Sequence, residues 1–361
     1  DPLKNEQKNA PKVAIGGILY DNPQTGYYTS QYLPYFIESI QAQDYQNIVL
    51  LFVDNSSDPD NSNIKYLRQH YPQAEIIRPS QNIGFAQANN LMIKKARELE
   101  ADYFLASNVD MFYEPNVVSE LVNAVMKTPQ VGSAVCKIKR WNFDLRHNGH
   151  KGKTNYIDSV GIEITKEHRF IDRGQGEIDH GQYDQEEEVF GGSGAAVIYR
   201  LSALEDVAFV REDGEKEYFD ELMFMYKEDV DLAYRLQWAG YKCIYTPKAI
   251  IYHDRTVRAV GKGILNIILN RWSRRREYKE WSWLNHHIIL QKVLDKSFSR
   301  RVRTKTWWYE IKSGLYVLLF EPHLLKQWWR LYKLRDKIRQ RRQQLKRRIE
   351  AKKHIEKLMV D

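Results

Sequence analysis

The stretch that best indicates the fold is Tyr103-Phe104-Leu105-Ala106-Ser107-Asn108-Val109-Asp110, an apolar run that passes directly into a polar, acidic segment. The apolar part predicts a buried strand, and Asp110 follows its carboxyl end. Asp54 stands in the same position after a run of strand formers at residues 48–53. Ligands of open α/β sheets bind outside the carboxyl ends of the strands. The two acids therefore predict a binding site at one edge of a sheet.

Strands and helices alternate through the first 110 residues. Strand patterns occupy residues 13–20, 48–53, 74–78 and 103–106, and helical patterns occupy residues 31–43, 64–70 and 86–99. This alternation predicts an α/β fold with a mostly parallel sheet and helices on both of its faces. Short strands and loops are expected between residues 141 and 188, where glycine, aspartate and histidine are frequent.

Charge is distributed unevenly along the 361 residues. The net charge of +8 combines −9 for residues 1–265 with +17 for residues 266–361. The two cysteines, Cys136 and Cys243, lack a CxxC spacing, which argues against a disulfide framework or a zinc site and favours a reducing compartment. The best apolar run, residues 315–320, is far shorter than the ~20 residues of a membrane-spanning helix.

We expect two parts, an α/β domain at residues 1–262 and a basic, tryptophan-rich helical extension at residues 263–361. Tryptophan and tyrosine alternate with arginine and lysine in the extension, as at Trp307, Trp308, Trp328 and Trp329. This composition fits a set of helices lying on an anionic membrane surface. It fits equally well a packed extension whose long basic side chains keep their charged ends in water. Residues 335–357 are almost wholly charged and polar, so we expect a solvated helix or a frayed tail there.

Asp110 and Asp54 have two interpretations each. Hard divalent cations bind one or two carboxylates together with substrate phosphates, and Asp110 could supply one of these. Taken alone, Asn108-Val109-Asp110 is more typical of a turn. Asp54 either accepts hydrogen bonds from a nucleobase or ribose, or it belongs to a turn and helix cap.

A third motif is Asn82-Ile83-Gly84-Phe85-Ala86-Gln87-Ala88-Asn89-Asn90. Glycine and small residues before a helix allow the backbone to approach a phosphate, and the helix amino terminus favours anions. The alternative is an ordinary strand-to-helix connection. The segment is not a P-loop, because no Gly-Lys-Ser/Thr follows.

The second acidic cluster is Glu228-Asp229-Val230-Asp231, just before a helical stretch at residues 232–239. Acids in a first helical turn are stabilised by the helix dipole, which explains the cluster without any function. In a functional interpretation one acid is a general base, and Asp229 is our choice, with Glu228 second. His253 follows a strand-like run and becomes a metal or diphosphate candidate if it converges on Asp110.

Together these motifs resemble the family 2 glycosyltransferases of the inverting, GT-A type, and within them the bacterial rhamnosyltransferase-like members. The resemblance covers roughly residues 12–255. It runs through Val53-Asp54-Asn55-Ser56-Ser57, the Asn82 motif, Asn108-Val109-Asp110, Asp158-Ser159-Val160-Gly161, Gly191-Gly192-Ser193-Gly194-Ala195-Ala196, Phe219-Asp220-Glu221 and the Glu228 cluster.

The resemblance implies a GT-A nucleotide-diphospho-sugar transferase fold, a dTDP- or UDP-sugar donor such as dTDP-L-rhamnose, a divalent cation (Mn²⁺ or Mg²⁺) and inversion at the anomeric carbon. The acceptor would be a saccharide or lipid-linked glycan of cell-surface polysaccharide synthesis. The enzyme would be cytoplasmic and peripheral at the inner face of the plasma membrane, with a homodimer as a further possibility.

It also implies roles for individual residues. Asp229 would be the catalytic base, with Glu228 beside it. The implied donor-binding residues are Asp54, Asn82, Gly84, Tyr20 and Asn108, the implied acceptor and sugar region is Gly192, Ser193, Gly194 and Asp231, and the implied metal ligands are Asp110 and His253.

The chain departs from the family pattern at several places. Asn108 replaces the first Asp of a DxD motif, and the segment around Tyr20 lacks the common Thr-Tyr-Asn ending. A non-catalytic GT-A scaffold and a nucleic-acid-binding protein that uses the basic tail are the alternatives. The second leaves the ordered carboxylates without a role.

Overall fold

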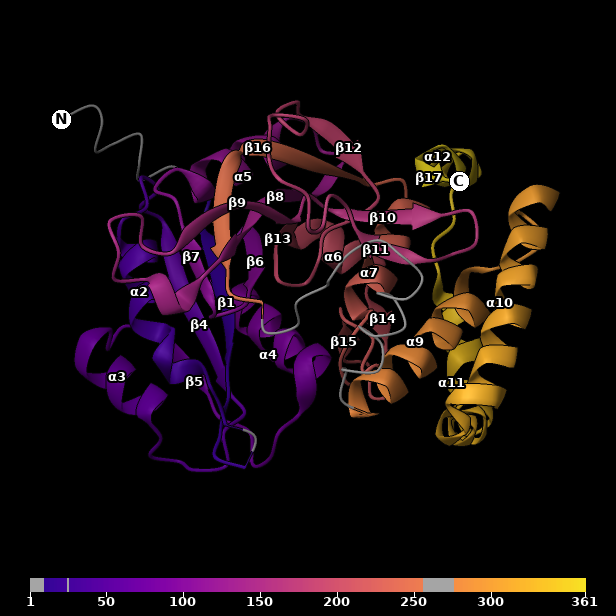
Figure 1. Cartoon of the computed structure of the whole chain (residues 1–361), viewed down its shortest axis with the longest axis horizontal. Coiled ribbons are helices and arrows are strands. Elements are labelled where there is room, and N and C mark those ends of the chain that lie inside the picture. The colour runs from indigo at the N-terminus through magenta and orange to yellow at the C-terminus, as the bar shows by residue number, and fades with distance from the viewer. Residues whose placement is uncertain (1–9, 25, 256–275) are drawn as a thin grey trace.

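A mixed ten-stranded sheet forms the centre of the molecule in the computed structural model, which describes residues 10–24, 26–255 and 276–361 (Figure 1). The strands of this sheet are β1 (Val13–Leu19), β4 (Ile48–Asp54), β5 (Glu75–Ile77), β6 (Tyr103–Ser107), β7 (Met111–Tyr113), β8 (Val131–Trp141), β9 (Lys153–Ser159), β12 (Glu187–Val189), β13 (Ala196–Arg200) and β16 (Lys242–His253). Along its main path their order is β12-β16-β8-β13-β6-β1-β4-β5.

The sheet has two parallel parts. β6, β1, β4 and β5 run parallel to one another, and β8 and β16 form a second parallel pair. β13 lies between the two parts and runs antiparallel to both β6 and β8. The predicted mostly parallel α/β sheet is thereby confirmed.

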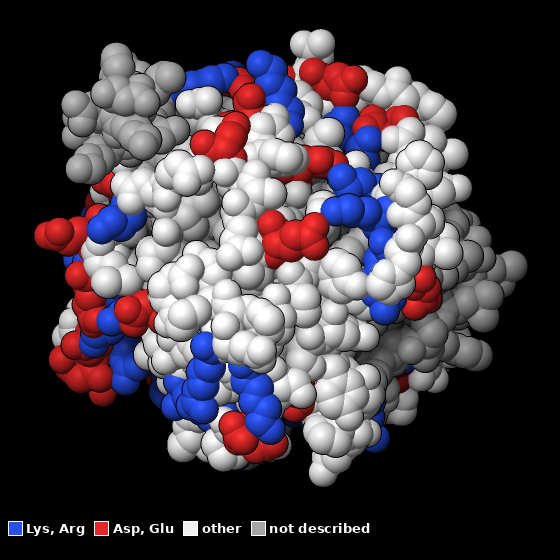
Figure 2. All heavy atoms as spheres, turned by 90° about the vertical axis from the view of Figure 1, so that its left-hand side faces the viewer, with Lys and Arg blue, Asp and Glu red and all other residues white. Residues whose placement is uncertain are grey.

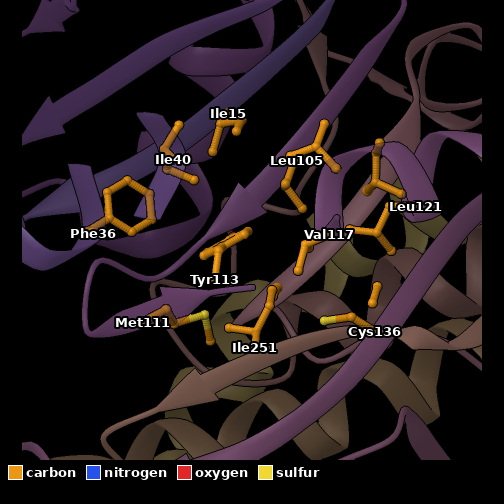
Figure 3. Close-up of a cluster of buried hydrophobic side chains, with 14 of the residues drawn as sticks. Ile15, Phe36, Ile40, Leu105, Met111, Tyr113, Val117, Leu121, Cys136 and Ile251 are labelled. Atoms are coloured by element: carbon orange, nitrogen blue, oxygen red, sulfur yellow. The ribbon is translucent and has the colours of Figure 1, made fainter. Parts of the chain in front are cut away.

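Helices cover both faces of the sheet, because successive side chains of a strand point to opposite sides. In β1, Val13 and Ile15 belong to one hydrophobic cluster and Ala14 to another. The first cluster packs on α2 (Leu33–Gln41) and α5 (Val117–Met126); Figure 3 shows Ile15 and Phe36 among its members. The second packs on α4 (Gly84–Glu98), α6 (Leu201–Val207) and α7 (Glu228–Trp238).

Short elements fill the connections between the larger helices and strands. Some of them lie within residues 141–188, where short strands and loops were expected. They are β2 (Asp21–Asn22), β3 (Tyr27–Tyr28), η1 (Thr29–Gln31), α3 (Ser62–His70), η2 (Phe143–Leu145), β10 (Ile162–Thr165), β11 (Phe170–Asp172), β14 (Phe209–Val210) and β15 (Lys216–Glu217). After the sheet come α9 (Arg276–Val293), α10 (Arg300–Phe320), η3 (Pro322–Leu325), α11 (Lys326–Gln344), α12 (Ala351–Leu358) and β17 (Met359–Val360).

The carboxy-terminal helices share a hydrophobic cluster with α7. Val230 and Tyr234 of α7 meet residues of α9, α11 and α12 there, and β17 pairs in parallel with β10. The solvated helix expected for residues 335–357 is present as the mostly exposed second half of α11, but the end of the chain is not frayed, because α12 is packed. Ile338 and Ile355 are buried in this cluster, and the backbone N–H of Arg348 donates to the Trp238 carbonyl at 2.9 Å.

The expected boundary at residues 262 and 263 lies outside the described residues, as do Arg258 and Trp272. None of the helices within the described ranges is long and apolar enough to cross a membrane. On the side of the molecule turned away from α10 and α11, basic and acidic side chains are interspersed with uncharged surface (Figure 2).

Candidate active site

The carboxyl ends of β1, β4 and β6 meet at one edge of the sheet. Leu19 pairs in register with Asp54, and Gly17 pairs with Ser107, so the segments that follow these strands begin side by side. Asn108 donates its backbone N–H to the Ala195 carbonyl at 2.8 Å, which attaches this edge to the segment before β13. Local strand endings therefore bring the predicted donor residues Tyr20, Asp54 and Asn108 to the same edge.

Asp110 and His253 converge, as the metal or diphosphate interpretation requires. His253 Nε2 lies 3.4 Å from Asp110 Oδ1, and both side chains are buried. The cause is strand pairing, because His253 at the end of β16 pairs with Met111 of β7. The backbone N–H of Asp254 also donates to the Asp110 carbonyl at 3.0 Å.

A second carboxylate lies on the other side of His253. Its Nδ1 atom is 2.8 Å from Asp158 Oδ2, and Arg255 joins Asp158 to Asp172 at 3.2 and 2.8 Å. Burial opposes the charged imidazole, but Asp110 and Asp158 outweigh it and raise the pKa of His253 to about 10. Burial likewise opposes the ionised Asp158, but His253 and Arg255 lower its pKa to about 2.

Asp110 is suited to hold a cation together with a substrate. Among the described residues no hydrogen-bond donor reaches Asp110 Oδ1, although this oxygen is buried. The described residues also contain no group of three or more His, Cys, Asp or Glu side chains arranged for a metal. Asp110 and His253 could thus supply only part of a coordination shell. That fits a Mg²⁺-like cation whose remaining ligands are water and substrate phosphates.

Two tyrosines lie near the carboxylates of Asp110 and Asp254. Tyr32 donates its hydroxyl to Asp254 Oδ2 at 2.7 Å. The pKa of Tyr27 is raised well above its ordinary value, and the largest cause is the negative charge of Asp110. The Tyr27 hydroxyl therefore lies within electrostatic reach of Asp110. Sequence reasoning assigned no role to Tyr27, Tyr32 or Asp158. Of the three, only Asp158 stood in a recognised motif.

Asp229 lies in the first turn of α7, which begins at Glu228 and so includes the acids that were expected just before the helix. Its two oxygens accept backbone hydrogen bonds from Gly194 and Val230, each at 2.8 Å. Asp229 is half-buried, and burial raises the pKa of its carboxyl. A carboxylate with a raised pKa and some access to solvent is suited to accept a proton.

Glu228 is enclosed more completely. Burial and the neighbouring Asp229 raise the pKa of Glu228 well above its ordinary value. Within the described part of the chain, no donor reaches its buried Oε2 atom. The raised pKa favours the neutral form of Glu228 over its charged form, which makes Asp229 the better candidate for the base.

The glycine-rich segment before β13 lies against Asp229 and α4. A Cβ atom on Gly192 would come within 2.4 Å of Val135, and one on Gly194 within 3.1 Å of the Phe85 ring. Ser193 between them is half-buried. Glycine is needed here for close packing, and the assignment of this segment to the sugar and acceptor region stays a prediction.

Asp54 is fully buried, and its oxygens already have partners. Oδ2 accepts from Asn61 and forms an ion pair with Arg78, each at 2.8 Å, and Oδ1 accepts from the Ser56 backbone at 3.0 Å. A nucleoside would have to share one of these oxygens. Contact between Asp54 and a donor thus stays a prediction.

The Asn82 motif begins α4. Asn82 accepts from the Gly84 backbone N–H at 2.9 Å, and Gly84 has a φ of +77°, which favours glycine. The next residue, Phe85, donates its N–H to the Phe224 carbonyl at 2.9 Å. Part of this helix amino terminus is therefore used to hold the segment that leads to Glu228.

Asp231 differs from its expected place in the acceptor region. Its carboxylate forms ion pairs with Arg235 at 3.0 Å and with Lys292 of α9, and it is buried. Lys292 is itself fully buried and also pairs with Asp220. Asp231 therefore joins α7 to α9 and does not face an acceptor. No local pattern marks Lys292 as buried, because a lysine in a basic tail is expected to be solvated.

Comparisons with known proteins agree with this arrangement. Residues 26–207, half of the chain, match the family model described as glycosyl transferase family 2. The chain is 23% identical over 240 residues to the N-acetylglucosaminyl-diphospho-decaprenol L-rhamnosyltransferase of Mycobacterium tuberculosis, in two strains. That match covers 63% of this chain and 74% of the relative.

The fold is also similar to a solved glycosyltransferase. The crystal structure of GalNAc-T7 with UDP, GalNAc and Mn²⁺ aligns with a TM-score of 0.55 at 11% identity. The alignment covers 92% of this chain and 56% of that protein, so it supports the fold alone. On the family match and this fold, the chain belongs to glycosyltransferase family 2 and is a glycosyltransferase with a GT-A fold.

Proposed function

We propose that the enzyme transfers a sugar, with inversion, from a dTDP- or UDP-sugar to a hydroxyl of a saccharide or lipid-linked glycan acceptor. The observation that carries this proposal is the placement of Asp229, a half-buried carboxylate with a raised pKa beside the glycine-rich segment. The relative from M. tuberculosis is named for L-rhamnose transfer to a lipid diphosphate, which favours dTDP-L-rhamnose and a role in cell-surface polysaccharide synthesis.

Asp229 and Asp110 belong to one electrostatically connected region. Burial is the largest cause of the raised pKa of Asp229, and the negative charge of Asp172 raises this pKa further. Arg255 pairs with both Asp172 and Asp158. Asp158 in turn contacts His253, which faces Asp110. A donor diphosphate near Asp110 and an acceptor hydroxyl near Asp229 can therefore occupy one site.

The reaction follows from these positions. Asp229 removes the proton of the acceptor hydroxyl while its oxygen attacks the anomeric carbon. The bond between that carbon and the diphosphate oxygen breaks, and the nucleoside diphosphate leaves with the electron pair. Attack from the side opposite the leaving group inverts the anomeric configuration.

A divalent cation would be held by Asp110, with His253 as the second protein ligand. When bound it would neutralise the negative charge that develops on the leaving diphosphate. In the absence of a metal, a protonated His253 together with Arg255 would offer positive charge in the same place, whereas His253 must be neutral to bind a cation. The Mn²⁺ in the GalNAc-T7 structure favours the cation.

We further propose that residues 1–262 form the catalytic domain and residues 263–361 an extension. The sheet and the carboxylates named above all lie before residue 255, and α9 to α12 follow residue 276. The nucleotide-sugar donor and the inner leaflet would both be reached from the cytoplasm.

A thermal-shift panel of UDP, dTDP, GDP, CDP and their sugars, with Mn²⁺, Mg²⁺ or EDTA, tests the donor. A ligand that binds only the folded state raises the free energy of unfolding by about 2.7 kcal/mol at a hundredfold excess over Kd. We expect a selective shift with dTDP or UDP compounds that EDTA removes. A thermal shift that EDTA does not change would contradict a bound metal. The absence of a thermal shift with every nucleotide would contradict the donor site.

A further inference from the structure

The hairpin of α10, η3 and α11 exposes a cluster of large apolar side chains. We call this cluster the hydrophobic tip; it comprises Leu315, Leu318, Leu319, Phe320, Leu325, Trp328, Trp329 and Tyr332. Their exposed fractions run from 38% for Leu325 to 69% for Leu319. Many large exposed apolar side chains within residues 315–332 indicate an interaction site in a folded protein.

The hydrophobic tip is separate from the buried residues of the same helices. The opposite faces of the same helices are already packed, with Val317 and Leu324 in a cluster with Trp283, and Leu331 in the cluster that includes α7. Glu321 at the turn is buried and pairs with Lys279 at 2.9 Å. The exposed side chains are thus a second, separate apolar face on a hairpin that already has its internal contacts.

The charge around the tip is basic. Residues 313–325 contain one acid, Glu321, and it is buried. Lys312 and Lys333 are exposed beside this stretch, and the exposed Lys326 pairs with Glu280 at 2.8 Å. A partner must therefore offer apolar surface and negative charge together.

We propose that the hydrophobic tip is a docking surface for an anionic membrane, which the protein meets without spanning it. Tryptophan and tyrosine favour the boundary between acyl chains and headgroups, and lysines beside them reach lipid phosphates. A second copy of the chain is a poorer partner. A twofold interface brings the same patch of each subunit together, so it would oppose the same lysines to one another.

The docking surface is coupled to the catalytic helix. α9 and α11 pack against each other, and both share a hydrophobic cluster with Val230 and Tyr234 of α7. The buried pair of Lys292 and Asp231 ties α9 to the first turn of α7. Binding of the tip to a membrane thereby fixes the orientation of Asp229 relative to that membrane.

Vesicle sedimentation with the full chain tests the proposal. The probes are vesicles of equal parts phosphatidylglycerol and phosphatidylcholine, and vesicles of phosphatidylcholine alone. The doubly substituted Leu319→Glu/Trp329→Glu should bind the anionic vesicles more than about tenfold more weakly, because two large side chains no longer enter the bilayer. The matched control Met126→Glu/Leu145→Glu adds the same charge at two exposed apolar residues of the α/β domain and should bind as the wild type does.

The charge contribution is measured with Lys312→Gln and Lys333→Gln. Each should weaken binding to anionic vesicles about fivefold, and neither should change binding to phosphatidylcholine. Equal binding by Leu319→Glu/Trp329→Glu and the wild type would overturn the proposal. A wild-type dimer in light scattering that this variant converts to a monomer, without vesicle binding by either, would assign the tip to a second copy. The nucleotide-induced thermal shift should be the same in all variants, so failure here is separable from failure of the proposed reaction.

Discussion

Asp229 Oδ2 accepts a hydrogen bond from the backbone N–H of Gly194 at 2.8 Å. This contact joins the first turn of α7 to the glycine-rich segment before β13. It leaves Asp229 half-buried in a place that an acceptor could reach, whereas Glu228 and Asp231 on the same turn are enclosed. The geometry leaves Asp229 more accessible than its two acidic neighbours, which is why we propose it as the base.

Asp229→Asn should lower kcat by about 10²–10⁴-fold, because an amide can still accept the Gly194 hydrogen bond but cannot act as a general base. Steady-state transfer kinetics measure the loss, and the donor-induced thermal shift should stay as in the wild type. The control is Glu120→Gln, which removes a half-buried acid from the first turn of α5 and should leave kcat unchanged. A fully active Asp229→Asn enzyme would rule out this residue as the base.

The activity should also depend on pH through Asp229. Burial raises the pKa of its carboxyl, and the base is active only when ionised. The value of kcat/KM should thus fall on the acid side at a pH above the ordinary pKa of aspartate, ~3.9. A profile of kcat/KM against pH that stays flat to about pH 4 would contradict the assignment.

Asp110→Asn should remove the metal-dependent part of the nucleotide thermal shift, because the amide no longer supplies a charged ligand beside His253. At a hundredfold excess of ligand the wild-type shift corresponds to about 2.7 kcal/mol, and the variant should keep only the part that EDTA leaves in the wild type. Asp213→Asn, on the exposed turn between β14 and β15, is the control. A shift that remains sensitive to EDTA in Asp110→Asn would place the cation elsewhere.

Asn285 of α9 holds the segment that leads to Asp229. Its side chain is buried and donates to the carbonyls of Met225 and Tyr226 at 2.8 and 2.7 Å. Tyr226 and the residue after it, Lys227, have φ values of +69° and +67°. Positive φ is strained in residues other than glycine, so this turn depends on its contacts.

We expect Asn285→Ala to lower the free energy of unfolding by about 1–3 kcal/mol, since two partly buried carbonyls lose the donor that they share. It should also lower kcat with little change in KM. The control Asn116→Ala removes a comparable side-chain bond to the Lys248 carbonyl at an exposed site. Denaturant unfolding and kinetics together check this, and an unchanged kcat at unchanged stability would show that the turn holds itself.

Glu217 should make stability fall as pH rises toward neutrality. Burial and Asp220 outweigh Arg341 and raise its pKa to about 7 from an ordinary value of 4.5. Between these two values the folded protein binds more protons than the unfolded chain, so this contribution is full below about pH 4.5 and is lost as pH rises through 7. The slope is at most about 1.4 kcal/mol per pH unit. Urea unfolding between pH 5 and 7 should show a shallower fall for Glu217→Gln, and equal slopes would contradict the shift.

The α/β half of the fold could be predicted because its signals are local. The run at residues 48–53 and the apolar stretch before Asn108 are strands in the structure, and alternation alone gave the layer order. Asp110 and His253 could be suspected for the same reason, as each follows a strand.

The remainder depends on contacts between distant segments. Lys292 and Asp231 meet across 61 residues, and a buried lysine in a basic tail has no local pattern. The same holds for the polar residues 335–357, where Ile338, Ala351 and Ile355 belong to the cluster that includes α7. Asp158 could be quoted as a motif, but its contact with His253 required the pairing of β8 with β9 and β16.

The most direct test of the central claim is the anomeric configuration of the product, measured by NMR after incubation with dTDP-L-rhamnose and an N-acetylglucosaminyl-diphospho-lipid acceptor. We expect a product of configuration opposite to that of the donor, formed by the wild type and not by Asp229→Asn. A product that retains the donor configuration, or equal product formation by both proteins, would contradict a direct displacement with Asp229 as the base.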